Sequence, residues 1–277
     1  MILDGKKVKE EILEKVKKEV KENNLKLCLA IILVGNNAAS EVYVSNKVKA
    51  CQNSFIDAKI IRLDEKVSEQ DIICEIEKLN KDDSITGIIL QSPIPNGLDI
   101  EKCIKHIDSK KDVDGFTNEN FYSLVHNLEG LRPCTANGII RVLDYYGIEI
   151  SGKNVCIIGR GSIVGKPLLF EFLNKDATVS ICHSKTKNII DYTKNADIIV
   201  VAAGQRNLLT ADMVNTNATV IDVGINVVDG KITGDVDFES VSKKCAYITP
   251  TPGGIGPVTV AIILENVLNA YKGGKSG

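Results

Sequence analysis

The chain has 277 residues, of which 44% are apolar, and its 34 basic and 36 acidic side chains nearly cancel. This length is typical of one large or two medium domains, at roughly 100–200 residues each. The apolar content and the formal net charge of -2 exclude a disordered chain, and they leave no basic excess to attract nucleic acid or a membrane surface. Apolar runs such as 28–34 are far shorter than the roughly 20 residues of a membrane-spanning helix.

The cysteines and the N-terminus indicate a soluble cytoplasmic enzyme. The N-terminal stretch M-I-L-D-G-K-K has no apolar core and no small-residue cleavage site, so we expect no signal peptide. The eight cysteines are well spread and form no C-x-x-C pair, which disfavours a disulfide scaffold or a zinc site. They are typical of small buried hydrophobic residues in a reducing compartment. The three histidines, His106, His126 and His183, are too scattered to predict a metal cluster.

The first part of the chain alternates between helical and strand patterns. Apolar residues at helical spacing predict an amphipathic helix over 5–22. The continuous apolar run at 27–34 ends at Gly35 and indicates a strand buried on both faces of a parallel sheet. The elements predicted next are a helix at 38–54, a strand at 58–63, a helix at 68–80 and a strand at 85–90. This βαβαβ order predicts right-handed crossovers and helices on both sheet faces.

The segment 91–134 has a different character, because it is rich in Pro, Gly, Asp and Asn and holds no long periodic run. A loop-rich stretch of this length is usually functional. The alternation then restarts, and a hairpin is expected around Asp229-Gly230. The elements predicted after the loop are helices at 135–147, 164–174, 186–194 and 257–271, and strands at 154–158, 177–182, 197–202, 218–222 and 246–249.

A glycine pattern in the second half predicts a dinucleotide site. Residues 155–167 read V-C-I-I-G-R-G-S-I-V-G-K-P, a strand, a turn and a helix start. Gly159, Gly161 and Gly165 are spaced G-x-G-x-x-x-G, a variant of the dinucleotide fingerprint. A tight turn needs a residue that tolerates positive φ, and a pyrophosphate needs close backbone approach at a helix N-terminus. A purely structural turn is the alternative.

The neighbouring side chains favour NADP among phosphate ligands. Arg160 stands where a P-loop needs its first glycine, and Pro167 replaces the Ser/Thr that would hold magnesium, so a P-loop is excluded. The next strand ends C-H-S-K-T, without the carboxylate that would bind the ribose diol of NAD. Ser184, Lys185 and Arg160 instead offer donors and positive charge for a 2′-phosphate.

These patterns together predict an α/β fold of two domains with a cleft between them. The first domain is expected to span 1–135 together with the C-terminal helix, 257–277. The second, 136–256, is expected to be a Rossmann-type dinucleotide-binding domain.

Four polar residues of the first domain are predicted to meet at one sheet edge. Tyr43 and Lys47 are four residues apart, which places them on one helix face near the carboxyl ends of the strands. Gln91 directly follows a predicted strand, and Asp114 lies in the loop K-D-V-D-G-F. A Tyr–Lys pair alone is typical of a solvated helix face. Open α/β sheets, however, bind ligands at this edge, so the four together indicate a site.

The sequence resembles the bifunctional methylenetetrahydrofolate dehydrogenase/cyclohydrolase family (FolD type). The matching stretches cover both predicted domains in order: V-G-N-N-A-A-S-E-V-Y-V-S-N-K (34–47), G-I-I-L-Q-S-P-I-P (87–95), K-D-V-D-G-F (111–116), R-P-C-T-A-N-G (132–138), G-R-G-S-I-V-G-K-P (159–167), C-H-S-K-T (182–186), D-V-G-I-N (222–226), G-D-V-D-F (234–238) and T-P-T-P-G-G-I-G-P-V-T (249–259). Two positions depart from the family pattern. Gly161 stands where a serine near the adenosine ribose is usual, and Phe55 stands where glycine is more usual.

The resemblance implies NADP-dependent oxidation of 5,10-methylenetetrahydrofolate and hydrolysis of the 5,10-methenyl product to 10-formyltetrahydrofolate. It implies a homodimer that acts on tetrahydrofolate substrates. The cofactor-binding residues implied are Gly159, Arg160, Gly161, Ser162, Ile163, Val164, Gly165, Ser184 and Ile225. The substrate-binding residues implied are Tyr43, Lys47, Gln91, Asp114, Pro252, Gly253 and Gly254.

The resemblance also implies roles for the catalytic residues Lys47, Gln91, Tyr43 and Asp114. Lys47 is expected to be the general acid/base of ring opening, with Gln91 orienting it. Tyr43 would stack on or hydrogen-bond the folate, and Asp114 would accept hydrogen bonds from the pterin.

Two other functions fit a two-domain nucleotide-binding chain. A hydroxy-acid dehydrogenase usually polarises its substrate carbonyl with a histidine paired to a carboxylate, and none of the three histidines lies in a convincing site loop. A non-catalytic NADP-binding regulator would not need a Lys, a Gln and an Asp converging at one sheet edge. Both are therefore disfavoured.

Overall fold

Two parallel β-sheets organise the chain, and each belongs to its own unit of the computed structural model, which describes residues 1–273. The three-stranded unit comprises Glu10–Cys134 and the chain from Val260 on. The five-stranded unit comprises Met1–Lys9 and Thr135–Thr259. The predicted fold class, two α/β units with parallel sheets, is confirmed, whereas the predicted domain boundaries stay a prediction.

The three-stranded sheet has the order β2-β1-β3, and all of its strands are parallel. In the central strand, every residue after Cys28 is buried, as the continuous apolar run predicted. Ile31 of β1 pairs with Ile60 of β2 and with Ile89 of β3, which fixes the register of the sheet. The strands are β1 (Cys28–Val34), β2 (Asp57–Leu63) and β3 (Gly87–Leu90).

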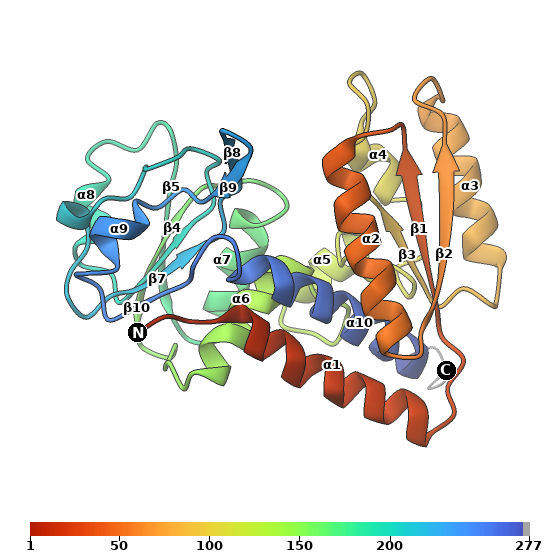
Figure 1. Ribbon diagram of the computed structural model, residues 1–277, viewed down its shortest axis with the longest axis horizontal. Helices are drawn as coiled ribbons and strands as arrows, with labels where there is room; N and C mark the ends of the chain where they lie inside the picture. The colour runs from red at the N-terminus through yellow and green to blue at the C-terminus, as the bar shows by residue number, and fades with distance from the viewer. Residues whose placement is uncertain (274–277) are drawn as a thin grey trace. The chain divides into compact units, whose positions relative to one another are not determined.

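Helices α2 and α3 cover the two faces of this sheet (Figure 1). Alternate residues of β1, among them Ala30 and Ile32, pack with Ile72 and Ile76 of α3 in one buried cluster. The N-terminus of α3 is fixed by a capping box, in which Ser68 Oγ accepts from the Asp71 backbone N–H at 3.2 Å and the Asp71 carboxylate accepts from the Ser68 N–H at 2.8 Å. The long helices of the first part of the chain are α1 (Gly5–Glu22), α2 (Ala38–Asn53) and α3 (Glu69–Lys81).

The loop-rich segment 91–134 contains two short helices that the sequence pattern did not predict, α4 (Ile100–Ile104) and α5 (Asn118–Val125). Asp99 caps α4 by accepting hydrogen bonds from the N–H groups of Glu101 and Lys102 at 3.0 and 3.2 Å. Both helices are too short for an apolar period to mark them in the sequence.

The last helix, α10 (Ile255–Gly273), contributes a buried polar contact to the three-stranded unit. The Nδ2 group of Asn266, which is buried, donates to the backbone carbonyls of Val113 and Arg132 at 3.0 and 2.9 Å. Because an unpaired buried amide is costly, these bonds hold the loop around residue 113 against the helix.

The five-stranded sheet has the order β10-β7-β6-β4-β5, again with parallel pairing throughout. Because β4 comes first along the chain and β5 and β6 lie on either side of it, the chain reverses direction across the sheet at β4. Open α/β sheets bind ligands at such a switch point, beyond the carboxyl ends of the strands. The strands are β4 (Asn154–Ile158), β5 (Thr178–Cys182), β6 (Ile198–Val201), β7 (Thr219–Asp222) and β10 (Tyr247–Ile248).

Most of the helices around this sheet are short. The predicted helix at 186–194 is wrong in length, because only Ile190–Thr193 is helical and Asn188 has a φ of 49°, which an α-helix does not accept. The turn η1 and helix α9 were not predicted. The helical segments of this part of the chain are α6 (Cys134–Tyr145), α7 (Gly165–Leu173), α8 (Ile190–Thr193), η1 (Ala211–Met213) and α9 (Phe238–Val241).

The predicted hairpin is confirmed as β8 (Asn226–Val228) and β9 (Lys231–Thr233). Its two turn residues, Asp229 and Gly230, have φ values of 49° and 72°, the left-handed conformation of a two-residue hairpin turn. The hairpin exposes apolar side chains, with Val227 71% exposed.

Six of the eight cysteines are buried, as the sequence predicted, whereas Cys28 is half-buried and Cys74 is exposed. All eight are free thiols, and burial raises the pKa of Cys51 to about 12. Such thiols are poor nucleophiles and pack as small hydrophobic residues. Among the described residues, no helix combines the length and apolar character needed to cross a membrane.

Candidate active site

The centre of the three-stranded unit's polar site is a buried contact between Lys47 and Gln91. Lys47 Nζ donates to Gln91 Oε1 at 2.9 Å, and the two residues are 7% and 6% exposed. The amide is held in turn, because Gln91 Nε2 donates to the carbonyl of Ser92 at 2.6 Å. A buried amine costs free energy unless it is hydrogen-bonded, and the neutral amide supplies this bond without adding a negative charge.

Local structure explains why these two side chains meet. Lys47 lies on the face of α2 that also buries Val44 and Cys51, at helical spacing. The backbone N–H of Gln91 donates to Ile32 O at 2.9 Å, which extends the pairing of β3 with β1 by one residue. The sequence prediction that Lys47 and Gln91 approach each other at the strand end therefore agrees with the structure.

Asp114 belongs to the same site, and its electrostatics depend on Lys47. Burial raises the pKa of the Asp114 carboxyl, the positive charge of Lys47 opposes this effect, and the negative charge of Asp112 adds to it. Tyr43 is half-buried, one turn before Lys47 on α2.

The loop that carries Asp114 is built around the buried carboxylate of Asp112. This carboxylate accepts from the N–H groups of Gly115 and Thr117 at 2.9 and 2.7 Å, and from Asn120 Nδ2 at 3.0 Å. Gly115 has a φ of 79°, and a Cβ there would lie 2.5 Å from the backbone of Arg132, so only glycine fits. No sequence pattern predicts this role of Asp112.

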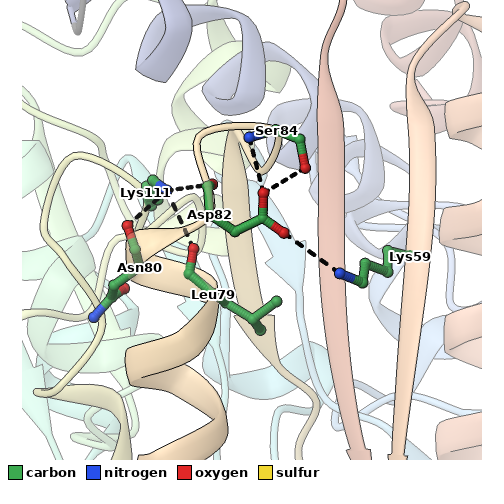
Figure 2. Close-up of polar contacts among 6 residues, drawn as sticks. All are labelled: Lys59, Leu79, Asn80, Asp82, Ser84 and Lys111. Atoms are coloured by element: carbon green, nitrogen blue, oxygen red, sulfur yellow. Dashed lines mark hydrogen bonds and ion pairs between the residues drawn. The ribbon is translucent and has the colours of Figure 1, made fainter.

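Lys111, at the start of the same loop, contacts the end of α3 (Figure 2). Its ammonium group donates to the carbonyls of Leu79, Asn80 and Asp82 at 3.1, 2.8 and 2.9 Å. These carbonyls lie at the C-terminus of α3, where orphan acceptors and the negative end of the helix dipole favour a cation. Lys111 was also missed, because its partners are backbone groups about 30 residues earlier in the chain.

The glycine turn of the five-stranded unit has two positions where only glycine fits. Gly159 has a φ of 123°, and a Cβ there would lie 2.1 Å from Ala202 O. A Cβ on Gly165 would lie 2.1 Å from Gly159 O, so the start of α7 packs directly on the turn. Gly161 differs, because no described atom lies within 4 Å of a Cβ placed there. The chain's own backbone thus occupies the Cβ positions of Gly159 and Gly165, whereas the space beside Gly161 is open.

The other predicted cofactor residues lie at the same edge of the sheet. Arg160, Ser162 and Ile163 follow β4 and are exposed, whereas Val164 is half-buried. Ser184, after β5, and Ile225, after β7, are likewise exposed. Since carboxyl ends of parallel strands share one edge, the turn and these side chains surround the switch point at β4.

Backbone conformation and packing explain why residues 253 and 254 are glycines. Gly253 has a φ of 108° and follows the cis Thr251-Pro252 bond. A Cβ on Gly254 would lie 2.6 Å from Pro250 O, and one on Gly5 would lie 1.7 Å from Gly254 O. This segment therefore lies tightly against the start of α1 within the five-stranded unit.

Comparison with known families assigns both units. A model described as the catalytic domain of tetrahydrofolate dehydrogenase/cyclohydrolase matches residues 3–114, and a model of its NAD(P)-binding domain matches residues 133–275. The chain belongs to the tetrahydrofolate dehydrogenase/cyclohydrolase family. The family predicted from the sequence is thereby confirmed, and the five-stranded unit carries its NAD(P)-binding domain.

Individual relatives match over almost the whole chain. The bifunctional protein FolD of a Nitratiruptor species is 48% identical, and the match covers 98% of this chain and 98% of the relative's chain. The structure of the bifunctional FolD enzyme from Campylobacter jejuni is 46% identical, with a TM-score of 0.96 over 99% of both chains. The N5,N10-methylenetetrahydrofolate dehydrogenase-cyclohydrolase of Trypanosoma brucei is 32% identical, with a TM-score of 0.94 over 100% of this chain and 99% of that chain.

A third polar residue missed from sequence, Asp222, lies at the end of β7. Its carboxylate accepts from the N–H groups of Gly224, Asp235 and Val236 at 3.1, 3.0 and 3.1 Å. Burial nonetheless raises the pKa of Asp222 to about 6, because desolvation outweighs these three donors and the negative charge of Asp235 acts in the same direction.

We predict that changing Lys111 to Met lowers the free energy of unfolding by about 1–3 kcal/mol, because three helix carbonyls lose their donor. The measurement is urea unfolding. Lys110→Met is the matched control, since the Lys110 side chain is exposed. Equal stability of the two variants would contradict the anchoring role of Lys111.

A second prediction concerns pH and Asp222. The folded chain holds the Asp222 proton more tightly than the unfolded chain, so this group lowers the free energy of unfolding as pH rises from the ordinary pKa of 3.8 to about 6. The slope is at most about 1.4 kcal/mol per pH unit. In Asp222→Asn this contribution is absent, so urea unfolding from pH 4 to 7 should give curves that differ in slope in this window. Parallel curves would refute the prediction.

Proposed function

We propose that this chain oxidises 5,10-methylenetetrahydrofolate to the 5,10-methenyl form with NADP, and hydrolyses that product to 10-formyltetrahydrofolate. The buried Lys47–Gln91 contact carries the proposal, because it places an amine and an orienting amide at the strand ends of the unit that matches the family's catalytic domain. The NAD(P)-binding domain in the same chain would bind the nucleotide that the oxidation step needs.

The residues of the glycine turn suit NADP. Open space beside Gly161 leaves room for a ligand to approach the turn, and α7 begins there with its N-terminal N–H groups. Arg160 and Ser184, which are both exposed, offer a cation and a hydroxyl for a 2′-phosphate. The relative from Trypanosoma brucei is described as complexed with NADP and an inhibitor. When bound, NADP accepts the hydride from the methylene carbon.

The cofactor site proposed is the set Gly159, Arg160, Gly161, Ser162, Ile163, Val164, Gly165, Ser184 and Ile225. These residues would orient the nicotinamide, because hydride transfer depends chiefly on holding the reacting carbons in place. The substrate site proposed comprises Tyr43, Lys47, Gln91, Asp114, Pro252, Gly253 and Gly254.

Ring opening requires proton transfer, and Lys47 is the proposed acid/base. Water adds to the cationic carbon of the methenyl form and loses a proton, and the ring nitrogen that leaves gains one. Gln91 fixes the Lys47 amine through the 2.9 Å hydrogen bond, so that the amine keeps one direction toward the substrate. An amide serves better than a carboxylate in this position, since a carboxylate would stabilise the ammonium form and hinder proton release.

Asp114 and Tyr43 are proposed to bind the folate. A half-buried carboxyl whose pKa is raised by burial gains most from donors such as the amino and ring N–H groups of a pterin. Tyr43 offers an aromatic face and a hydroxyl on the same helix as Lys47.

The protein is further proposed to act as a homodimer in the cytoplasm. The exposed apolar side chains of the β8–β9 hairpin support an assembly, since Val227 and Ile232 are 71% and 46% exposed.

Changing Lys47 to Met is predicted to lower cyclohydrolase kcat/KM by at least about 100-fold, the usual contribution of a general acid/base. Dehydrogenase activity should fall much less, because hydride transfer needs no proton from Lys47. The assays follow NADPH formation from 5,10-methylenetetrahydrofolate and, separately, loss of the methenyl form. Lys49→Met, an exposed lysine on the same helix, is the control. Ring opening within a few-fold of wild type in the Lys47 variant would remove Lys47 from this role.

Changing Arg160 to Ala is predicted to lower kcat/KM for NADP by about 10–100-fold, the value of one charge-assisted hydrogen bond. Activity with NAD should stay unchanged, because NAD has no 2′-phosphate. Lys175→Ala is the control, since Lys175 lies beyond the other end of α7. An equal loss with both nucleotides would contradict a 2′-phosphate contact.

A further inference from the structure

A second buried carboxylate, Asp235, links two loops at the nucleotide edge of the five-stranded sheet. Its Oδ2 accepts from the N–H groups of Ala203 and Gly204 at 2.7 and 2.8 Å. Its Oδ1 accepts from Asn226 Nδ2 at 2.9 Å. The residue is fully buried, so its carboxylate is shielded from water. Charge-assisted hydrogen bonds are stronger in such an interior than in water.

The position of Asp235 is itself closely determined. Its backbone N–H donates to Asp222 Oδ1 at 3.0 Å. A Cβ on Gly224 would lie 2.1 Å from Asp235 Cγ, and one on Gly234 would lie 1.7 Å from Asp222 Oδ2. Backbone therefore packs directly against both carboxylates, which leaves Asp235 no room to shift.

The groups that Asp235 holds face the proposed cofactor site. Ala203 and Gly204 directly follow Ala202, whose carbonyl fills the space where Gly159 would carry a Cβ. The loop after β6 thus forms the other side of the glycine turn, across the switch point. Ile225, 53% exposed, lies between Gly224 and Asn226, the residue that Asp235 binds.

We propose that Asp235 is a positioning residue for the nicotinamide dinucleotide, acting through the backbone of 202–204 and through Ile225. The inference rests on the proposed NADP-dependent function and adds a residue outside its cofactor site. Asp235 does not touch the cofactor. It fixes the two backbone segments whose spacing the cofactor requires.

A carboxylate is needed because all of the groups around Asp235 are donors. In Asp235→Asn, one orientation of the amide would set its NH₂ against the N–H groups of Ala203 and Gly204. The opposite orientation would set it against Asn226 Nδ2. Asn226 cannot rotate to relieve the clash without losing its bond to Gly234 O at 3.0 Å.

The experiment compares Asp235→Asn with wild type by calorimetric binding of NADP and by both activities. The Kd and KM for NADP are expected to rise by about tenfold or more. Cyclohydrolase kcat/KM on the 5,10-methenyl substrate, measured without nucleotide, should stay within about twofold, since proton transfer in ring opening uses residues of the three-stranded unit. Asp237→Asn is the matched control, because its carboxylate accepts from Ser240 Oγ at 2.6 Å and serves α9 instead.

Two results would overturn the proposal. One is an unchanged Kd for NADP in Asp235→Asn. The other is a parallel fall of both activities with no change in the KM for NADP, which indicates a purely structural role. If Asp235→Asn fails to fold, Asn226→Ala provides the same readouts with one carboxylate bond removed. The binding measurement needs no folate turnover, so a wild-type chain that binds NADP but does not oxidise the folate would refute the proposed function alone.

Discussion

The hydrogen bond from Lys47 to Gln91 requires helix α2 to lie beside the carboxyl end of strand β3 in the three-stranded sheet. Lys47 shares the buried face of α2, and Gln91 continues the pairing of β3 with β1. A slip of one residue in β3 would turn the amide to the other sheet face and leave a buried amine without its acceptor. The continuous apolar core of β1 makes such a slip unfavourable, so the packing of the strand protects the chemistry of the site.

The loop around Asp114 shows how a carboxyl group is kept in a place where burial opposes its charge. Asp112 accepts from the backbone N–H of Gly115, and Lys111 donates to a backbone carbonyl at the end of α3. Asn266 donates to the carbonyl of Val113, the residue before Asp114. These contacts are paired polar interactions, so their stability offsets the desolvation of the Asp114 carboxyl. The same arrangement occurs in the five-stranded unit, where buried aspartates hold backbone that faces the glycine turn.

Sequence reasoning predicted the parts of the fold that carry strong periodic signals. The buried strands, the long helices and the hairpin at Asp229 were found, because each pattern extends over several residues or needs left-handed turn residues. The short helices α4 and α5 were missed, since they have no period to detect. At the site, Lys47 and Gln91 were predicted to approach each other because strand ends share an edge. Lys111, Asp112 and Asp235 were not assigned roles, because their partners are mostly backbone groups that no sequence pattern marks.

The glycine turn combines two constrained positions with one unconstrained position. Gly159 and Gly165 are each fixed by a carbonyl oxygen in the place of a side chain, whereas Gly161 has open space around it. A side chain at residue 161 would therefore extend into open space without any repacking of the five-stranded unit. Substitution there would alter the surface beside the turn while the two constrained glycines keep its backbone shape unchanged.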